Sequence, residues 1–366
     1  MGFSPERLRD IRIKYGYTVE ELATQLGISK QAVSKYENGL AIPSVGVLNK
    51  LIALFSLPVG YLGKTEILPT QSSSIFYRRH KKTSKKEVEI ARVTLKWYFE
   101  MIYAIREFLS VPVSYIPEFD KNLSIEEKAK ALRNSWKLGI MPINDLASLL
   151  ERQGFYLLAL QLDGVQTDAY SQRMQEYALI VLNQNKGTRE RKNFSLAHEL
   201  GHLVLHTGEE FAGSEKKERE ADEFAACFLM PTESFSNDIV LETPNAFVEL
   251  GEKWHVSPQA AVERSYRLGL LGRNEEENRA HRESLLGRLG KRKNFYFSED
   301  IDLCSIRGYL ERIDADKYMR EEFLQKLCFP IREIQRLCRD SNIFQNIQER
   351  LEDPYELEGV QLSFNF

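Results

Sequence analysis

Apolar residues recur at helical intervals along most of the chain. Residues 1–63 have the pattern of several short amphipathic helices, and 87–109 that of one long helix. Two more helices are expected between residues 124 and 153, and helical patterns dominate again up to about residue 290. The pattern predicts a multidomain, mainly α-helical protein.

Two short runs depart from this helical pattern. "FYLLALQL" (155–162) and "YALIVLN" (177–183) are apolar and bounded by glycine or asparagine, so each predicts a β-strand. Because helical patterns surround both runs, the sequence predicts a central α+β domain with a small sheet.

Breaks in the pattern suggest where the chain divides. "LPTQSSS" (68–74), the two prolines of "SVPVSYIPEF" and "GRLGKRKN" (287–294) interrupt the helices. They divide the chain into segments 1–63, 64–117, 118–286 and 287–366. The last segment is helical in pattern, and its role does not follow from any motif.

Composition narrows the class of protein. The chain has 366 residues, enough for two or three domains, with a net charge of −3 and no apolar run of ~18 residues. Its first ten residues lack the apolar core of a signal peptide. The four cysteines have no metal or redox spacing and are expected to be buried free thiols: Cys227, Cys304, Cys328 and Cys338. These features predict a cytoplasmic protein that does not enter a membrane.

The stretch "TVEELATQLGISKQAVSKYENG" (18–39) has the features of a helix-turn-helix. Thr18 and Glu21 form a capping box, Gly27 suits the tight turn, and Ser29 can cap the second helix. The apolar positions supply a buried seam: Leu22, Ala23, Leu26, Ile28, Val33 and Tyr36. The outward positions carry donors suited to bases and phosphates in a major groove: Lys30, Gln31, Ser34, Lys35 and Asn38.

Residues 4–63 resemble the lambda-repressor/Cro (XRE-type) DNA-binding domain, including "YENG" and Pro43, which is expected to open the next helix. The resemblance implies double-stranded operator DNA as a partner, bound by a homodimer on two half-sites. The alternative is a helical bundle used only for protein contacts. The basic run 78–86 either adds phosphate contacts or is a solvated linker.

"FSLAHELGHLVLH" (194–206) places candidate metal ligands on one helix. His198 and His202 are four residues apart, so both imidazoles can reach one zinc ion. Glu199 lies beside that face and can accept a proton from a metal-bound water, which is the logic of the H-E-x-x-H signature of zinc peptidases. His206 would lie ~12 Å from His198 along a straight helix, so it is expected to be a structural or rim histidine.

The third ligand is expected from "SEKKEREADEFAACFLMP" (214–231), a helix with Glu218 and Asp222 one turn apart beside its apolar face. This spacing suggests that Glu218 binds zinc while Asp222 accepts the ring N–H of a zinc-bound histidine. Glu215 and Glu220 are competitors that fall on other faces of the helix.

Two histidines, one glutamate and water make an open, catalytic zinc site. Zinc would activate water toward a peptide carbonyl while Glu199 transfers the proton. The strand 177–183, if it lies at the sheet edge, could align an extended substrate. The group that stabilises the oxyanion is not assigned, and nearby candidates are Tyr170, Tyr177 and Arg191.

The motifs "ALIVLN…RKNFSLAHELGHLVLH…EREADEFAACFLMP" resemble, in order, those of the ImmA/IrrE family of bacterial and phage-associated metallopeptidases. The resemblance covers roughly residues 120–280. It implies a zincin-like fold that cleaves regulatory repressors, with zinc on His198, His202 and Glu218 and with Glu199 catalytic. "KWHVSPQAAVERSYRLGLL" (253–271) superficially imitates a second helix-turn-helix, but the resemblance implies packing helices.

The sequence thus predicts a helix-turn-helix domain (1–63), a linker with a long connecting helix (64–117), a peptidase domain (118–286) and a C-terminal extension (287–366). This organisation is compatible with two hypotheses about the function of the protein. In the first, the protein is a DNA-binding regulator whose zinc endopeptidase cleaves a repressor, a toxin–antitoxin partner or itself, for example at "LPTQSSS". In the second, it is a repressor or antitoxin whose metal domain is a sensor or dimerisation module. Glu199 favours the first hypothesis, because a sensor needs metal ligands but no general base. The fused DNA-binding domain (residues 1–63, called the DNA reader below) favours the second, because a stand-alone protease does not need to bind DNA.

Overall fold

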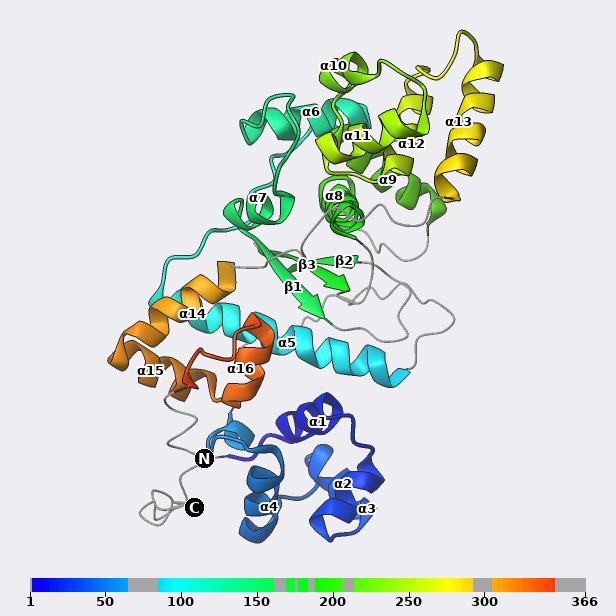
Figure 1. Cartoon of the computed structure of the whole chain (residues 1–366). Coiled ribbons are helices and arrows are strands. Elements are labelled where there is room, and N and C mark those ends of the chain that lie inside the picture. Colours follow the sequence, from blue (N-terminus) through cyan, green and yellow to red (C-terminus); the bar gives the residue numbers. More distant parts are fainter. Residues whose placement is uncertain are drawn as a thin grey trace. The chain divides into compact units, whose positions relative to one another are not determined.

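The computed structural model describes residues 2–64, 85–160, 169–174, 177–183, 188–206, 214–291 and 305–345. The chain forms two compact units, which are described separately. The first unit combines residues 1–72, 81–111 and 304–366, and the second combines 73–80 and 112–303. Both are built mainly from helices, with one three-stranded sheet among the described residues (Figure 1).

Several predicted features lie outside the described residues. These are the breaks at 68–74 and 292–294, residues 78–84 of the basic run, Cys304, residues 161–162 of the first predicted strand, and the end of the chain from residue 346. Within the described part, no helix is both long and apolar enough to cross a bilayer.

The first unit begins with the predicted helix-turn-helix. Its elements are α1 (Pro5–Lys14), α2 (Val19–Leu26), α3 (Lys30–Glu37), α4 (Val45–Phe55) and the short 3₁₀ helix η1 (Tyr61–Gly63). Thr18 and Glu21 form the expected reciprocal capping box at the start of α2. Gly27 ends α2 in a left-handed conformation (φ 68°), and Ser29 caps α3. Helix α4 starts after the cap Ser44 rather than at Pro43.

The long helix predicted at 87–109 is α5 (Lys85–Phe108). This helix, expected to be a connecting helix, lies in the core of the first unit. Trp97, Tyr98 and Phe99 are consecutive and all buried, so apolar side chains cover more than one face of the helix. Helix α5 packs against α1 and against the C-terminal helices α14 (Ser305–Ala315) and α15 (Lys317–Leu327). The predicted segments 64–117 and 287–366 are therefore each divided between the two units.

The second unit contains the sheet and nine further helices within its described residues. Before the sheet come α6 (Ile125–Ser135) and α7 (Leu146–Arg152), and the strands are β1 (Phe155–Leu160), β2 (Ala169–Met174) and β3 (Tyr177–Asn183). The helices that follow are α8 (Arg189–Leu205), α9 (Glu215–Leu229), α10 (Thr232–Phe235), η2 (Ser236–Asp238), α11 (Pro244–Trp254), α12 (Pro258–Arg267) and α13 (Glu275–Gly290).

The sheet order is β1-β3-β2, with β1 parallel and β2 antiparallel to β3. The condition for residues 177–183 to align a substrate, a position at the sheet edge, is not met, because β3 lies between the other two strands. All seven residues of β3 are buried, as expected for a central strand. The edge strand β2 was not predicted, because "AYSQRM" contains no continuous apolar run.

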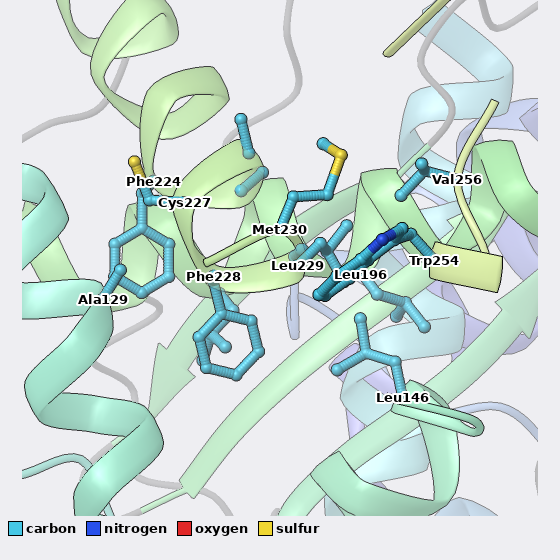
Figure 2. Close-up of a cluster of buried hydrophobic side chains, with 14 of the residues drawn as sticks. Ala129, Leu146, Leu196, Phe224, Cys227, Phe228, Leu229, Met230, Trp254 and Val256 are labelled. Carbon is cyan, nitrogen blue, oxygen red and sulfur yellow. The ribbon is translucent and has the colours of Figure 1, made fainter. Parts of the chain in front are cut away.

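Helices α8 and α9 pack against each other, and α8 also contacts β2 and β3. Figure 2 shows part of the core, where Phe224 and Phe228 of α9 lie among side chains from several other elements. Gly201 permits the close approach of the two helices. A Cβ atom there would lie 3.1 Å from the Phe224 ring and 3.2 Å from the Ala221 carbonyl oxygen. This approach brings the histidine face of α8 next to the carboxylates of α9.

Helices α11 and α12, which overlap the second helix-turn-helix-like stretch, pack against each other. Ala261 and Val262 are completely buried. The Arg264 guanidinium donates to the Met230 carbonyl oxygen at 3.1 Å and to Thr232 Oγ1 at 2.8 Å. Because Arg264 is held in the interior, α12 acts as a packing helix, as the family resemblance implied.

Candidate metal centre

Three of the predicted metal ligands converge between α8 and α9. Thr188 caps α8, which runs for 17 residues and carries His198 and His202 on one face. Their Nε2 atoms lie 3.0 Å apart. The Glu218 carboxylate of α9 completes the group, with Oε2 at 3.3 Å from His198 Nε2 and Oε1 at 3.6 Å from His202 Nε2. One ligand atom from each residue lies within 4.8 Å of the others.

These separations fit a metal ion. Donor atoms bound at ~2.0–2.2 Å in a tetrahedral zinc site lie ~3.3–3.6 Å from one another. The observed separations of 3.0, 3.3 and 3.6 Å are close to that range. Two imidazole nitrogens and a carboxylate are a common donor set for catalytic zinc, which keeps a further position open to water or substrate. The three side chains therefore form a candidate site for zinc.

Asp222 lies where a residue that orients a metal ligand would be expected. Its Oδ1 is 2.7 Å from His198 Nδ1, on the ring edge opposite the converging Nε2. A carboxylate only accepts hydrogen bonds, so His198 Nδ1–H is the donor. This bond fixes the tautomer in which Nε2 carries the lone pair that a metal needs.

Glu199 is buried beside the same face of α8, and its carboxylate is held by a residue that the sequence analysis missed. Ser171 Oγ, on the edge strand β2, donates to Glu199 Oε2 at 2.7 Å. The residue was missed because strand β2 was missed. A polar residue on a short alternating strand ahead of the H-E-x-x-H helix was the available signal.

His206 and Glu220 also belong to the surroundings of the site. His206 is a buried residue that follows α8, and its Nδ1 lies 3.1 Å from His202 Nδ1. Glu220, a competitor for the third ligand in the sequence analysis, places Oε2 at 2.9 Å from His206 Nε2 instead. Glu215, the other competitor, is 92% exposed and faces Arg219.

The three candidates for stabilising an oxyanion lie in different surroundings. Tyr177 is completely buried and its ring packs against Tyr156 with centroids 5.7 Å apart. Tyr170 is buried on β2, and Arg191 is exposed in the first turn of α8. The oxyanion donor therefore stays unassigned.

The predicted DNA-contacting residues share one accessible surface. All five are exposed on or directly after α3: Lys30, Gln31, Ser34, Lys35 and Asn38. Lys30 Nζ lies 3.2 Å from Glu20, and Asn38 Nδ2 donates to the Ser34 carbonyl oxygen at 2.7 Å. Asn38 therefore also caps the end of α3, while Gln31 and Lys35 extend from its exposed face.

Comparison with protein families matches both regions of the chain. Residues 8–62 match the helix-turn-helix family model. Residues 150–266 match the model of the IrrE N-terminal-like domain, peptidase family M78. The second match includes the sheet, α8, α9 and all the candidate metal ligands.

The chain is also similar to curated transcriptional regulators. It is 28% identical over 142 residues to the HTH-type transcriptional regulator ImmR of Bacillus subtilis, which covers 38% of this chain and 94% of that protein. It is 28% identical over 118 residues to the HTH-type transcriptional activator BcrR of Enterococcus faecalis, covering 32% of this chain. A regulatory protein of the HTH type from Pyrococcus furiosus is 44% identical over 54 residues, 15% of this chain. The chain spans only 17% of the Pyrococcus protein and 50% of BcrR.

Proposed function

Because the chain joins a helix-turn-helix domain to an IrrE N-terminal-like peptidase domain, we propose that it is a DNA-binding transcriptional regulator with a zinc-dependent endopeptidase that cleaves a regulatory protein. The observation that carries the proposal is the Glu199 carboxylate, buried beside the candidate ligands and held by Ser171. A metal sensor needs ligands but no general base, so this carboxylate favours catalysis.

In the proposed mechanism, His198, His202 and Glu218 would hold the ion, and Asp222 would orient His198. When bound, zinc polarises the scissile carbonyl and lowers the pKa of water toward ~7. Glu199 accepts the proton of the attacking water and delivers it to the leaving amine. The hydroxyl of Ser171 donates to Oε2 of Glu199 and so holds the carboxylate in place.

Strand β2 is the proposed guide for the substrate. Among the described strands it pairs with β3 on one side only, and it contacts α8. An extended peptide could add to its other edge through backbone hydrogen bonds. Ser171 lies on this strand and touches Glu199, so such a peptide would lie near the proposed general base.

The proposed partner of the first unit is double-stranded operator DNA. Helix α3 would enter the major groove with Gln31 and Lys35 facing base edges and phosphates. A single small reader binds weakly, so we propose a homodimer on two half-sites.

A second candidate is a transcriptional repressor or antitoxin in which the metal domain is a sensor or dimerisation module. The observation that favours it is that the curated relatives are named as transcriptional regulators. The two candidates differ in one respect: only the peptidase needs Glu199.

The test combines zinc content with fragment analysis. Purified protein should hold about one zinc per chain, which His202→Ala and Glu218→Ala should remove while Glu199→Gln and the exposed control Glu215→Gln retain it. Wild type and Glu199→Gln are then incubated with candidate repressors encoded nearby, and fragments are identified by mass spectrometry. Fragments produced by the wild type alone support the peptidase. Bound zinc with no fragments, or with identical fragments from both proteins, supports the second candidate.

A further inference from the structure

His202 is contacted at both nitrogens of its ring. Its Nε2 faces His198 and Glu218 in the candidate metal site. Its Nδ1 lies 3.1 Å from Nδ1 of His206, and Nε2 of His206 lies 2.9 Å from Glu220 Oε2. A chain of polar contacts therefore connects the Glu220 carboxylate on α9, through His206, to Nδ1 of His202, the ring nitrogen that faces away from the candidate metal site.

This chain of polar contacts forms because helix α8 ends just before His206. The helix stops at Leu205, and His206 takes a non-helical conformation (φ −119°, ψ 44°). Its ring is tilted against that of His202, with centroids 5.2 Å apart and an interplanar angle of 47°. The His206 side chain is only 5% exposed, whereas the Glu220 side chain is 30% exposed. The imidazole is thus enclosed between His202 and a carboxylate that reaches the surface.

The chemistry of the three groups fixes the direction of the hydrogen bonds. A carboxylate accepts only, so His206 must carry its proton on Nε2 and donate to Glu220. The neutral His206 ring then has its lone pair on Nδ1 and can only accept from His202 Nδ1–H. As a result, Nε2 of His202 keeps the lone pair that faces His198 and Glu218. The opposite arrangement would place two acceptors, His206 Nε2 and Glu220 Oε2, 2.9 Å apart, outside the candidate metal site, where an ion would separate acceptors.

We propose that Glu220 and His206 are positioning residues that fix the tautomer of His202, as Asp222 does directly for His198. This inference rests on the proposed metal role of His202. It gives a specific role to His206, which was expected to be a structural or rim histidine, and it gives Glu220 a role other than ligation. Loss of a group that orients a metal-binding histidine typically lowers metal affinity ~10–100-fold.

The test uses the full chain and two measurements that do not depend on proteolysis. The zinc dissociation constant is measured by chelator competition. The tautomer of His202 is measured by ¹⁵N NMR of the histidine rings in the metal-free protein. His206→Phe removes the acceptor and should weaken zinc ~10–100-fold and leave His202 without a fixed Nδ1–H. Glu220→Ala removes the acceptor for His206 Nε2–H at a partly exposed site and should act in the same direction. This variant keeps the proposal testable should His206→Phe fail to fold.

Two further variants sharpen the interpretation. His206→Asn places an amide oxygen where Nδ1 was, so it should restore most of the zinc affinity. Glu215→Ala, exposed on the same helix as Glu220, should change neither measurement. Unchanged affinity and tautomer in both His206→Phe and Glu220→Ala would overturn the proposal, as would weaker zinc binding with an unchanged tautomer. If wild type bound no zinc, the proposed function would fail, while the NMR measurement would still decide whether His206 orients His202.

Discussion

Arg7 and Glu100 form a two-pronged ion pair in which both side chains are completely buried. The two guanidinium nitrogens donate to the two carboxylate oxygens at 3.0 and 2.6 Å. Arg7 belongs to α1 of the helix-turn-helix, and Glu100 belongs to α5. Removing one partner of a buried pair leaves an uncompensated charge, which costs ~3–5 kcal/mol. The pair therefore joins the DNA reader to α5 independently of the chain that connects them.

Other contacts extend this interface to the C-terminal helices. Lys14 Nζ donates to Thr94 Oγ1 of α5 at 2.9 Å and lies 3.2 Å from Glu333 of α16 (Ile331–Cys338). Lys64 donates to the carbonyl oxygen of Leu327 at the end of α15 at 2.8 Å. Polar contacts within the first unit therefore bind the DNA reader to α5, α15 and α16, although these helices are far from it in sequence.

A cut between the reader and α5 should therefore not release the reader. Residues 68–74 are replaced by the recognition sequence of a site-specific protease, and the cleaved protein is analysed by size exclusion. We expect the N-terminal fragment to elute with the rest of the chain, because the buried contacts persist. Glu100→Ala should promote its release, whereas Glu89→Ala, at a half-exposed position of the same helix, should not. Separate elution of the fragment from the cleaved, otherwise unmodified protein would contradict this prediction.

Ser171 should matter for catalysis and not for metal binding. Ser171→Ala removes the hydrogen bond to Glu199 Oε2, and a hydrogen bond to a charged group contributes ~1.5–3 kcal/mol. We expect at least about a tenfold lower rate of proteolysis with unchanged zinc content, since ~1.4 kcal/mol corresponds to tenfold in rate. Ser171→Thr keeps the hydroxyl and should retain most of the activity. Zinc loss in Ser171→Ala would show that the residue supports the fold of the site instead.

Gly201 should be necessary for the close packing of α8 on α9. Gly201→Val would place side-chain carbons against Phe224 and the Ala221 carbonyl oxygen, which lie within 3.2 Å of a Cβ at this position. Such overpacking costs ~1–3 kcal/mol. We expect a lower melting temperature and weaker zinc binding. Gly287→Val is the matched control, because a Cβ there has no neighbour within 4 Å.

Structural features could be predicted from the sequence where they depend on residues close together in the chain. The capping box of Thr18 and the convergence of His198 with His202 follow from helical spacing alone, and Glu218 and Asp222 follow from the same spacing on α9. His206 was expected to be a structural or rim histidine, and it is buried outside the group of candidate ligands. Its contact with His202 was not predicted, because it depends on the end of α8 at Leu205. Local capping cannot be read from a helical repeat.

Long-range pairing explains the other differences. Strand β2 is mostly polar and alternating, so its place beside β3 depends on a partner that the local pattern does not reveal. The packing of α5 with α14 and α15 joins segments about 200 residues apart, and no local motif marks it. The complete burial of Glu100 could not be predicted from the local sequence, because its partner Arg7 lies in a distant segment of the chain.

The buried thiols should react slowly at neutral pH. Burial raises the pKa of Cys227 and of Cys338 to about 11 each. The thiolate is the reactive form, so labelling should be slow at pH 7 and accelerate as the pH rises toward those values. Alkylation followed by peptide mass spectrometry measures each cysteine separately in native and denatured protein. Equal rates for Cys227 in the two states would contradict its burial.

DNA recognition should depend on α3 in two distinguishable ways. Gln31→Ala removes a donor suited to a base edge, so it should weaken operator binding by ~1–3 kcal/mol and relax sequence preference. Lys35→Ala removes a positive charge suited to a phosphate, so it should weaken binding to all sequences and reduce the salt dependence by about one ion. Gln25→Ala, exposed on α2, is the matched control for Gln31 and should have little effect. Binding isotherms at several salt concentrations, with operator and unrelated DNA, separate these effects. If Gln31→Ala and Lys35→Ala both bind operator like the wild type, α3 is not the reading helix.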